Sequence, residues 1–202
     1  VAYSALQNVQ DSMVKGGKGH TDGNGIALDQ ALKAGAVMAL NLRGGQKDLA
    51  GAAIQSDWMP ADTRALITGE DISADALGNT ANPNRIANPD NLKFSEKLRT
   101  LFIGEDSSQH VNNFLWAYNV DTKMLSRLMS VPAGGESTGL HAVDEVNGWM
   151  YIMSNFQHAG DWGGIHSVVK DTLDPLIKAN YKNKFGAAVG YLTGMPTQMK
   201  LG

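Results

Sequence analysis

The sequence predicts an all-β protein, in particular several blades of a β-propeller with short helical excursions. Short runs of aromatic and β-branched residues alternate with turn residues along the chain, a pattern typical of strands. Glycine accounts for 23 of the 202 residues, which suits many tight turns. Two similar segments also place Ile103 and Ile152 in matching positions, 49 residues apart. That spacing fits the period of about 40–50 residues that propeller blades show.

The first part of the chain predicts two strands separated by loops. Val1–Val9 and Gly35–Leu42 carry apolar residues and β-formers, which predicts a strand for each. Lys15–Asn24 is rich in glycine, and we expect a plain loop because no Gly-Lys-Ser/Thr ending indicates phosphate binding. Trp58–Asp75 combines Pro60 with short helical signals, so we expect this segment to leave the sheet.

The strand pattern is clearest in the second half of the chain. Asp121-Thr122-Lys123 and Asn147-Gly148 are expected to be hairpin turns. Asp171–Asn183 predicts a short helix or a set of turns, and Gly186–Leu192 predicts a last strand. Five further apolar runs, divided by turn residues, are predicted to be strands: Leu98–Gly104, Asn113–Val120, Met124–Val131, Leu140–Asp144 and Trp149–Ser154.

Composition and charge are those of an ordinary globular protein. The net charge of -3 and the pI near 5.9 give no general attraction for nucleic acid or for anionic membranes. We expect no membrane span, because the chain has no apolar run of the length that a spanning helix needs. The chain has no cysteine, which excludes disulfides and thiolate metal sites within it. We expect residues 1–202 to form a single domain, with the site loops in residues 81–162.

Acidic residues at predicted strand ends and turns suggest a site for a hard cation. Calcium takes about six to eight oxygen ligands from carboxylates, amides and carbonyls. Glu105 and Asp106 directly follow a predicted strand, Asp90 follows Pro89, and Glu136 follows two glycines. We therefore take Asp90, Glu105, Asp106 and Glu136 as candidate metal ligands. For Glu105 and Asp106 an acidic turn in solvent is the alternative interpretation, and for Asp90 an ordinary turn residue.

One histidine and one arginine are candidate catalytic residues. His158 follows an apolar run and precedes a turn, where it could ligate a metal, bind an anion or act as an acid. A histidine that only bonds nearby backbone is the alternative. Arg85 lies five residues before Asp90 and could give two hydrogen bonds to a phosphoryl group. A surface arginine is the alternative there.

Other catalytic motifs are missing from the sequence. The remaining histidines show no spacing of the HxH or HExxH type, which argues against a zinc site. No Gly-x-Ser-x-Gly motif occurs to suggest a serine hydrolase. Trp116 and Tyr118 alternate with smaller residues on one predicted strand and are expected to lie in the core.

Three longer strings in the sequence carry a resemblance to a known family. RIANPDNLKFSEKLRTLFIGEDSSQHVNNFLWAYN, GGESTGL and YIMSNFQHAGDW together resemble the bacterial PhoX-type alkaline phosphatases, in particular a secreted branch of that family. The likeness extends more loosely to VAYSALQNVQDSM and AAVGYLTGMP. It covers most of this chain but only the C-terminal part of a family member. We therefore expect a partial chain, whose partner is the remaining part of the same propeller.

The resemblance implies a β-propeller that is exported to the periplasm or beyond and hydrolyses phosphate esters with calcium and iron. Asp90, Asp106 and Glu136 match positions at which the family carries site residues, and His158 lies in another characteristic loop. Glu105 and Arg85 are assigned to the site only because they lie close in the sequence to these matched residues. The metals of the family would polarise the phosphoryl group and activate a nucleophile.

The chain departs from the family pattern in one respect. The iron-binding cysteine of the family has no counterpart here, and an upstream arginine–glutamate segment is also missing. Either these groups belong to a further part of the polypeptide, or this branch lacks the iron site. Two other functions therefore stay open: a non-enzymatic, calcium-stabilised propeller that serves as a surface or assembly module, and a lactonase-like hydrolase.

Overall fold

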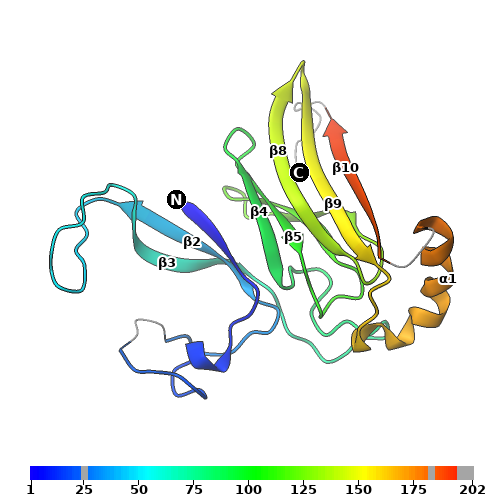
Figure 1. Ribbon diagram of the computed structural model, residues 1–202. Helices are drawn as coiled ribbons and strands as arrows, with labels where there is room; N and C mark the ends of the chain where they lie inside the picture. The colour runs from blue at the N-terminus through cyan, green and yellow to red at the C-terminus, as the bar shows by residue number, and fades with distance from the viewer. Residues whose placement is uncertain (24–26, 182–184, 195–202) are drawn as a thin grey trace.

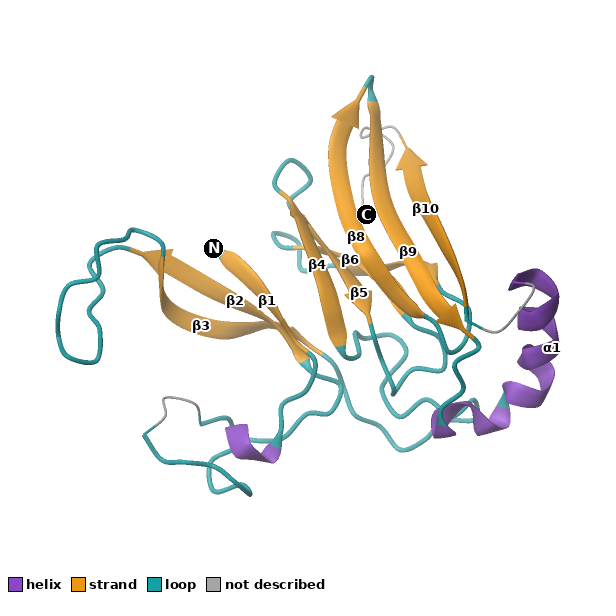
Figure 2. Cartoon of the chain, in the orientation of Figure 1, coloured by secondary structure: helices purple, strands orange, loops and turns teal. Residues whose placement is uncertain are grey.

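The protein is built almost entirely from antiparallel β-sheets (Figure 1). The computed structural model describes residues 1–23, 27–181 and 185–194. These residues form two three-stranded sheets and one four-stranded sheet, with the four-stranded sheet between the other two (Figure 2). The predicted all-β class is confirmed, and no closed barrel or propeller forms within the described part of the chain. None of the described helices is long and apolar enough to cross a membrane.

The first sheet has the strand order β1-β2-β3. It consists of β1 (Ala2–Leu6), β2 (Ala36–Arg43) and β3 (Met59–Thr68), and a short 3-10 helix, Asp11–Met13, follows β1. The prediction that Trp58–Asp75 leaves the sheet is wrong, because β3 pairs with β2 along most of its length. No residue of β3 is fully buried and half of them are exposed, so the strand lacks the apolar alternation that would identify it in the sequence. Pro60 is tolerated because β3 is an edge strand.

The central sheet is a meander of four consecutive strands. It contains β4 (Pro89–Ser95), β5 (Thr100–Glu105), β6 (Phe114–Asn119) and β7 (Leu125–Ser130). The predicted hairpin turn at Asp121-Thr122-Lys123 is confirmed and joins β6 to β7.

The third sheet has the order β8-β9-β10 and carries the helices at its side. Its strands β8 and β9 extend beyond the predicted apolar runs and meet at the predicted turn Asn147-Gly148, where both residues have positive φ. The predicted helix is confirmed as far as residue 181, and the rest of that prediction lies outside the described residues. The elements are β8 (Glu136–Val146), β9 (Trp149–Ala159), the 3-10 helix Gly164–Val168, α1 (Lys170–Tyr181) and β10 (Gly186–Gly194).

The three sheets pack face to face and share two apolar layers. Ile103 and Trp116 project from one face of the central sheet and pack with Val37 of the first sheet. Phe102 projects from the opposite face and packs with Ile152 of the third sheet. Every residue of β5 is buried for this reason. Burial on both faces explains why this strand is an unbroken apolar run in the sequence.

The two similar sequence segments fold into equivalent hairpins. The first becomes the β4–β5 hairpin and contains Ile103, and the second becomes the β8–β9 hairpin and contains Ile152. Both isoleucines are fully buried in a strand that has a partner on each side. The sequence repeat therefore corresponds to a structural repeat of hairpins in neighbouring sheets.

Candidate functional site

Several strands of all three sheets begin or end at the same edge of the molecule. The ends of β1, β5 and β9 and the beginnings of β4 and β8 lie together along the lower edge in Figure 1. Antiparallel order makes this possible, because one strand leaves the edge where its neighbour enters it. Loops at such an edge collect polar side chains on a rigid scaffold.

Close contact between β5 and β8 at this edge depends on a glycine. A Cβ atom added to Gly104 would lie 2.6 Å from the carbonyl oxygen of Ser137. Any other residue at position 104 would therefore push β8 away from β5. Since Asp106 follows the one strand and Glu136 begins the other, this contact places their carboxylates near each other.

Asp106 lies at the centre of a group of acidic side chains. Partial burial raises the pKa of its carboxyl, and the negative charges of Glu136 and Asp90 raise the pKa further. The positive charge available on His158 and a hydrogen bond from Gln7 lower the pKa, but they do not outweigh the other effects. Glu136, Asp90 and His158, three other residues predicted from the sequence, therefore lie close enough to Asp106 to affect its charge. We call Asp90, Asp106, Glu136 and His158 the acidic cluster.

Asp90 is held by two amide side chains. Asn91 Nδ2 donates to Asp90 Oδ2 at 2.8 Å, and Gln7 Nε2 lies 3.4 Å from Asp90 Oδ1. Gln7 also donates to Asp106, so it lies between the two carboxylates. Gln7 follows strand β1 and belongs to the first sheet, which therefore contributes to the cluster. No local pattern in the sequence points to this glutamine.

His158 and Glu136 form the other side of the acidic cluster. The His158 Nδ1 atom lies 2.9 Å from the carbonyl oxygen of Gly134 and must donate, because a carbonyl only accepts. The Nε2 atom faces Glu136 Oε2 at 3.4 Å. Glu136 also accepts a hydrogen bond from Gln157 Nε2. In its neutral form His158 therefore has the Nε2 lone pair directed toward the cluster, where it can bind a cation or take up a proton.

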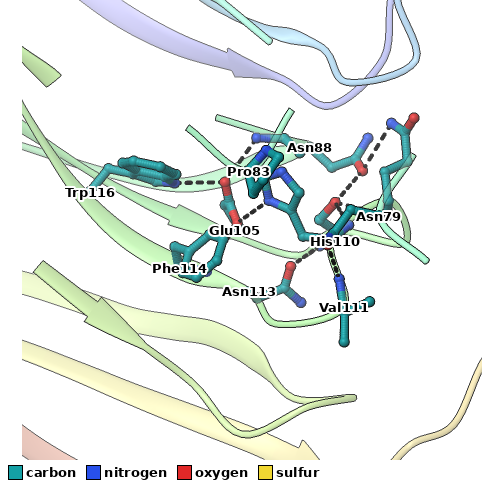
Figure 3. Close-up of polar contacts among 12 residues, drawn as sticks. Asn79, Pro83, Asn88, Glu105, His110, Val111, Asn113, Phe114 and Trp116 are labelled. Carbon is teal, nitrogen blue, oxygen red and sulfur yellow. Dashed lines mark hydrogen bonds and ion pairs between the residues drawn. The ribbon is translucent and has the colours of Figure 1, made fainter. Parts of the chain in front are cut away.

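Glu105 lies apart from the acidic cluster, although it is the residue before Asp106. Its side chain is fully buried and points into the interior (Figure 3). Oε1 accepts hydrogen bonds from Ala87 N at 2.8 Å and Trp116 Nε1 at 2.6 Å. Oε2 accepts a bond from Phe114 N at 3.0 Å and faces His110 Nδ1 at 3.0 Å. All four sites of this carboxylate are used internally, so we leave Glu105 out of the candidate cation site.

His110 is an important polar residue that the sequence did not identify. Its ring is fully buried, and Nε2 lies 3.2 Å from the carbonyl oxygen of Asn82. Its other nitrogen faces Glu105, and the ring edge packs on Phe114. The partners come from separate segments of the chain, so no local spacing could reveal them. His110 and Glu105 form a structural pair beneath the acidic cluster.

Arg85 also lies away from the acidic cluster. Its Nε atom is 2.9 Å from Glu70 Oε2, and both side chains are about half exposed. It lines a different hollow, of about 450 Å³, with Ala65 and Lys123 among its neighbours. The structure thus brings together four of the six predicted site residues and places Glu105 and Arg85 elsewhere.

An open pocket of about 460 Å³ adjoins the acidic cluster. Asp106 and His158 of the cluster line this pocket together with Asp161 and Trp162. A volume of this size is in the range of small-molecule sites. The other lining residues are Ser107, Ser108, Asn113, Gly134, Gly163, Gly164, Ile165 and His166.

The acidic cluster fits a hard cation by the type of its ligands. Three carboxylates and several amide and carbonyl oxygens are the donors that calcium takes. Burial is the main cause of the raised pKa of Asp106, and the negative charges of Glu136 and Asp90 add to it; a bound cation would offset those charges. Within residues 1–23, 27–181 and 185–194, no three such side chains are close enough to enclose an ion as they lie. Binding would therefore require these side chains to move closer together.

Comparison of the chain with known protein families, curated proteins and solved structures finds no match.

Proposed function

We propose that the protein is a metal-dependent phosphoester hydrolase of the alkaline phosphatase type. One observation carries the proposal: Asp90, Asp106, Glu136 and His158 meet at the edge where all three sheets end, beside an open pocket. These are the residues that the resemblance to PhoX-type phosphatases assigns to the site. The same resemblance supports export to the periplasm or beyond.

The acidic cluster would hold the metal. Calcium bound by Asp90, Asp106 and Glu136 would supply positive charge to the phosphoryl oxygens and so stabilise the transition state. Without a cation three carboxylates would repel a phosphate ester, so the proposal requires one. Iron accompanies calcium in the resembling family, but no residue of this chain is assigned to it.

The protein's own side chains would position the substrate and move a proton. His158 is fixed through Nδ1 by Gly134, so Nε2 can exchange a proton with a group in the pocket. Gln7 and Asn91 hold the carboxylate of Asp90 through their amides. The pocket beside Trp162 would accommodate the alcohol part of the ester.

We further propose that the three sheets are blades of a propeller that additional sheets complete. The central sheet is covered by a sheet on each face, whereas the outer face of the third sheet exposes Met153, Val189 and Tyr191. Another β-sheet packed on this face would bury these side chains. Native mass spectrometry tests this: we expect assemblies heavier than the 21.6 kDa of this chain, and a stable single chain would contradict it.

The activity is tested by phosphate release from a phosphate monoester with and without calcium. We expect Glu136→Gln to lower the rate about 100-fold or more, because charge stabilisation by a metal is worth several kcal/mol. Glu145→Gln is the matched control, since Glu145 lies on the same strand and pairs with Lys97. An equal rate for the two variants, or for calcium-free enzyme, would contradict the proposal.

A second function is favoured by the position of Arg85. The pocket beside the acidic cluster has no lysine or arginine among its described lining residues. A phosphoryl group bound there would therefore meet no basic side chain from these residues. A calcium-stabilised module for surface binding or assembly needs no such group. That function predicts a melting temperature that rises with calcium and no turnover of phosphate esters. Lactone hydrolysis, measured on the same preparation, would distinguish a lactonase from the phosphatase and from the non-enzymatic module.

A further inference from the structure

Asn88 occupies an unusual place between the first and central sheets. It precedes strand β4 by one residue, is buried, and has a φ of 43°. Residues other than glycine seldom adopt this left-handed conformation, although asparagine does so more readily than most. Asp90, a member of the acidic cluster, follows two residues later.

The side chain of Asn88 uses all of its hydrogen-bonding capacity. Its Nδ2 atom donates to the carbonyl oxygens of Gln7 and Lys33, each at 2.8 Å. Its Oδ1 atom accepts from Ser107 Oγ at 2.8 Å and lies 3.4 Å from Gln109 Nε2. The first pair of bonds reaches the first sheet, and the second pair reaches the loop after β5 (Figure 3 shows Asn88 above that loop).

The backbone of Asn88 makes the same connection. Its N–H donates to the carbonyl oxygen of Ala34 at 2.8 Å, and its carbonyl accepts from the N–H of Asp106 at 3.2 Å. Asn88 is thus bonded directly to Gln7 and Asp106, and it lies two residues from Asp90. The network continues to the β8 side, because Ser107 N donates to Asn113 Oδ1 and Asn113 Nδ2 donates to Gly135 O. Gly135 is the residue before Glu136.

We propose that Asn88 is a positioning residue that holds Gln7, Asp90 and Asp106 at the distances the acidic cluster requires. The expected effect of Asn88 on calcium binding rests on the proposed function. Its expected effect on the geometry of the loops around Asp90 and Asp106 is independent of that function.

Substitutions at this position would lose the side-chain contacts, the backbone conformation or both. Aspartate would set a carboxylate oxygen against the carbonyl oxygens of Gln7 and Lys33, which would repel it. Alanine would keep neither the bonds nor an easy left-handed backbone. Glycine can keep the backbone conformation while it removes the side-chain contacts. Asn88→Gly therefore isolates the contribution of the side chain.

The test compares Asn88→Gly with two controls. Asn147→Gly changes another asparagine of positive φ, in the β8–β9 turn at the opposite end of those strands. Leu101→Ala opens a cavity in β5 and is expected to lower the melting temperature without touching the cluster. Calcium affinity by calorimetry and amide hydrogen exchange at Asp106 and Ser107 are measured on all three and on wild type.

We expect Asn88→Gly to weaken calcium binding about tenfold or more, a loss of the size that one hydrogen-bond network can cause. We also expect faster exchange at Asp106 and Ser107. Neither control should change the calcium affinity, even if its melting temperature falls as much as that of Asn88→Gly. Wild-type affinity and exchange in Asn88→Gly would overturn the proposal. If wild type binds no calcium, the proposed function fails, and the exchange rates alone decide whether Asn88 positions these loops.

Discussion

Glu105 and Asp106 are neighbours in the sequence, yet the fold treats their carboxylates in opposite ways. Glu105 is fully buried and faces four hydrogen-bond donors. Asp106 is exposed and lies near the carboxylates of Glu136 and Asp90. The alternation of side chains at the end of strand β5 sends one inward and the other out of the sheet. A carboxylate surrounded by hydrogen-bond donors stabilises the fold. A carboxylate surrounded by other anions is available to a ligand.

Removing the inward carboxylate should have the largest effect on stability. We expect Glu105→Ala to lower the free energy of unfolding by about 3–5 kcal/mol, because it leaves buried donors and the ring of His110 without their partner. Urea unfolding, monitored by tryptophan fluorescence, measures this loss of free energy.

Asp106→Ala is the matched control for that variant. It removes a carboxylate one residue away and should change the free energy of unfolding far less. Equal losses for the two variants would mean that the two carboxylates do not differ in the way the structure shows.

Removing the outward carboxylate should have the largest effect on cation binding. We expect Asp106→Asn to weaken calcium affinity about tenfold or more, corresponding to about 1.4 kcal/mol or more of binding free energy. Calorimetric titration measures the affinity. Glu145→Gln, at the far end of strand β8, should bind calcium as wild type does. If the two variants bound calcium equally well, Asp106 would not be a ligand.

Asp106 should also make stability depend on pH in a defined direction. Its pKa is raised in the folded state, so between the ordinary and the raised pKa the folded protein binds more protons than the unfolded chain. Stability from this group is therefore present at low pH and is lost as the pH rises through that window. The effect is a few tenths of a kcal/mol, since solvent screens an exposed carboxyl.

Urea unfolding without calcium, at several pH values from acid to neutral, measures the contribution. We expect Asp106→Asn to be slightly more stable than wild type at neutral pH and to lose that advantage in acid. A variant that is less stable than wild type at neutral pH would contradict the raised pKa.

The smallest effect is expected from the partner of Asp90 in the first sheet. Gln7→Glu replaces a hydrogen-bond donor by a carboxylate beside Asp90 and Asp106. Without calcium the variant should be less stable than wild type, because the added negative charge is repelled. Added calcium should restore part of the lost stability. The melting temperature measured in both conditions tests this. Gln46→Glu, on a loop of the same sheet, is the control and should show no calcium dependence.

Local sequence patterns predict much of the fold and part of the site. Apolar runs with turn residues between them identify β2, β5, β6, β7 and β9, because burial leaves a direct mark on composition. They do not identify β3, in which no residue is fully buried. The residues Asp90, Asp106, Glu136 and His158 were expected at one site, and the structure brings them near one another.

Non-local contacts explain the residues that the sequence did not place. His110 and Asn88 owe their roles to partners on segments far away in the chain, such as Asn82, Gln7 and Lys33. Glu105 looked like a ligand because its inward direction depends on the strand phase, which a boundary error of one residue reverses. A hydrogen-bond network of this kind becomes visible only once the sheets are assembled.

Calcium binding by the wild-type protein, compared with Glu136→Gln, is the decisive measurement for the acidic cluster. We expect wild type to bind calcium with a measurable heat and to gain melting temperature. Glu136→Gln should lose both effects, and Glu145→Gln should keep both. Wild-type protein that binds no calcium, or Glu136→Gln that binds it as tightly as wild type, would contradict the assignment of the acidic cluster as a cation site.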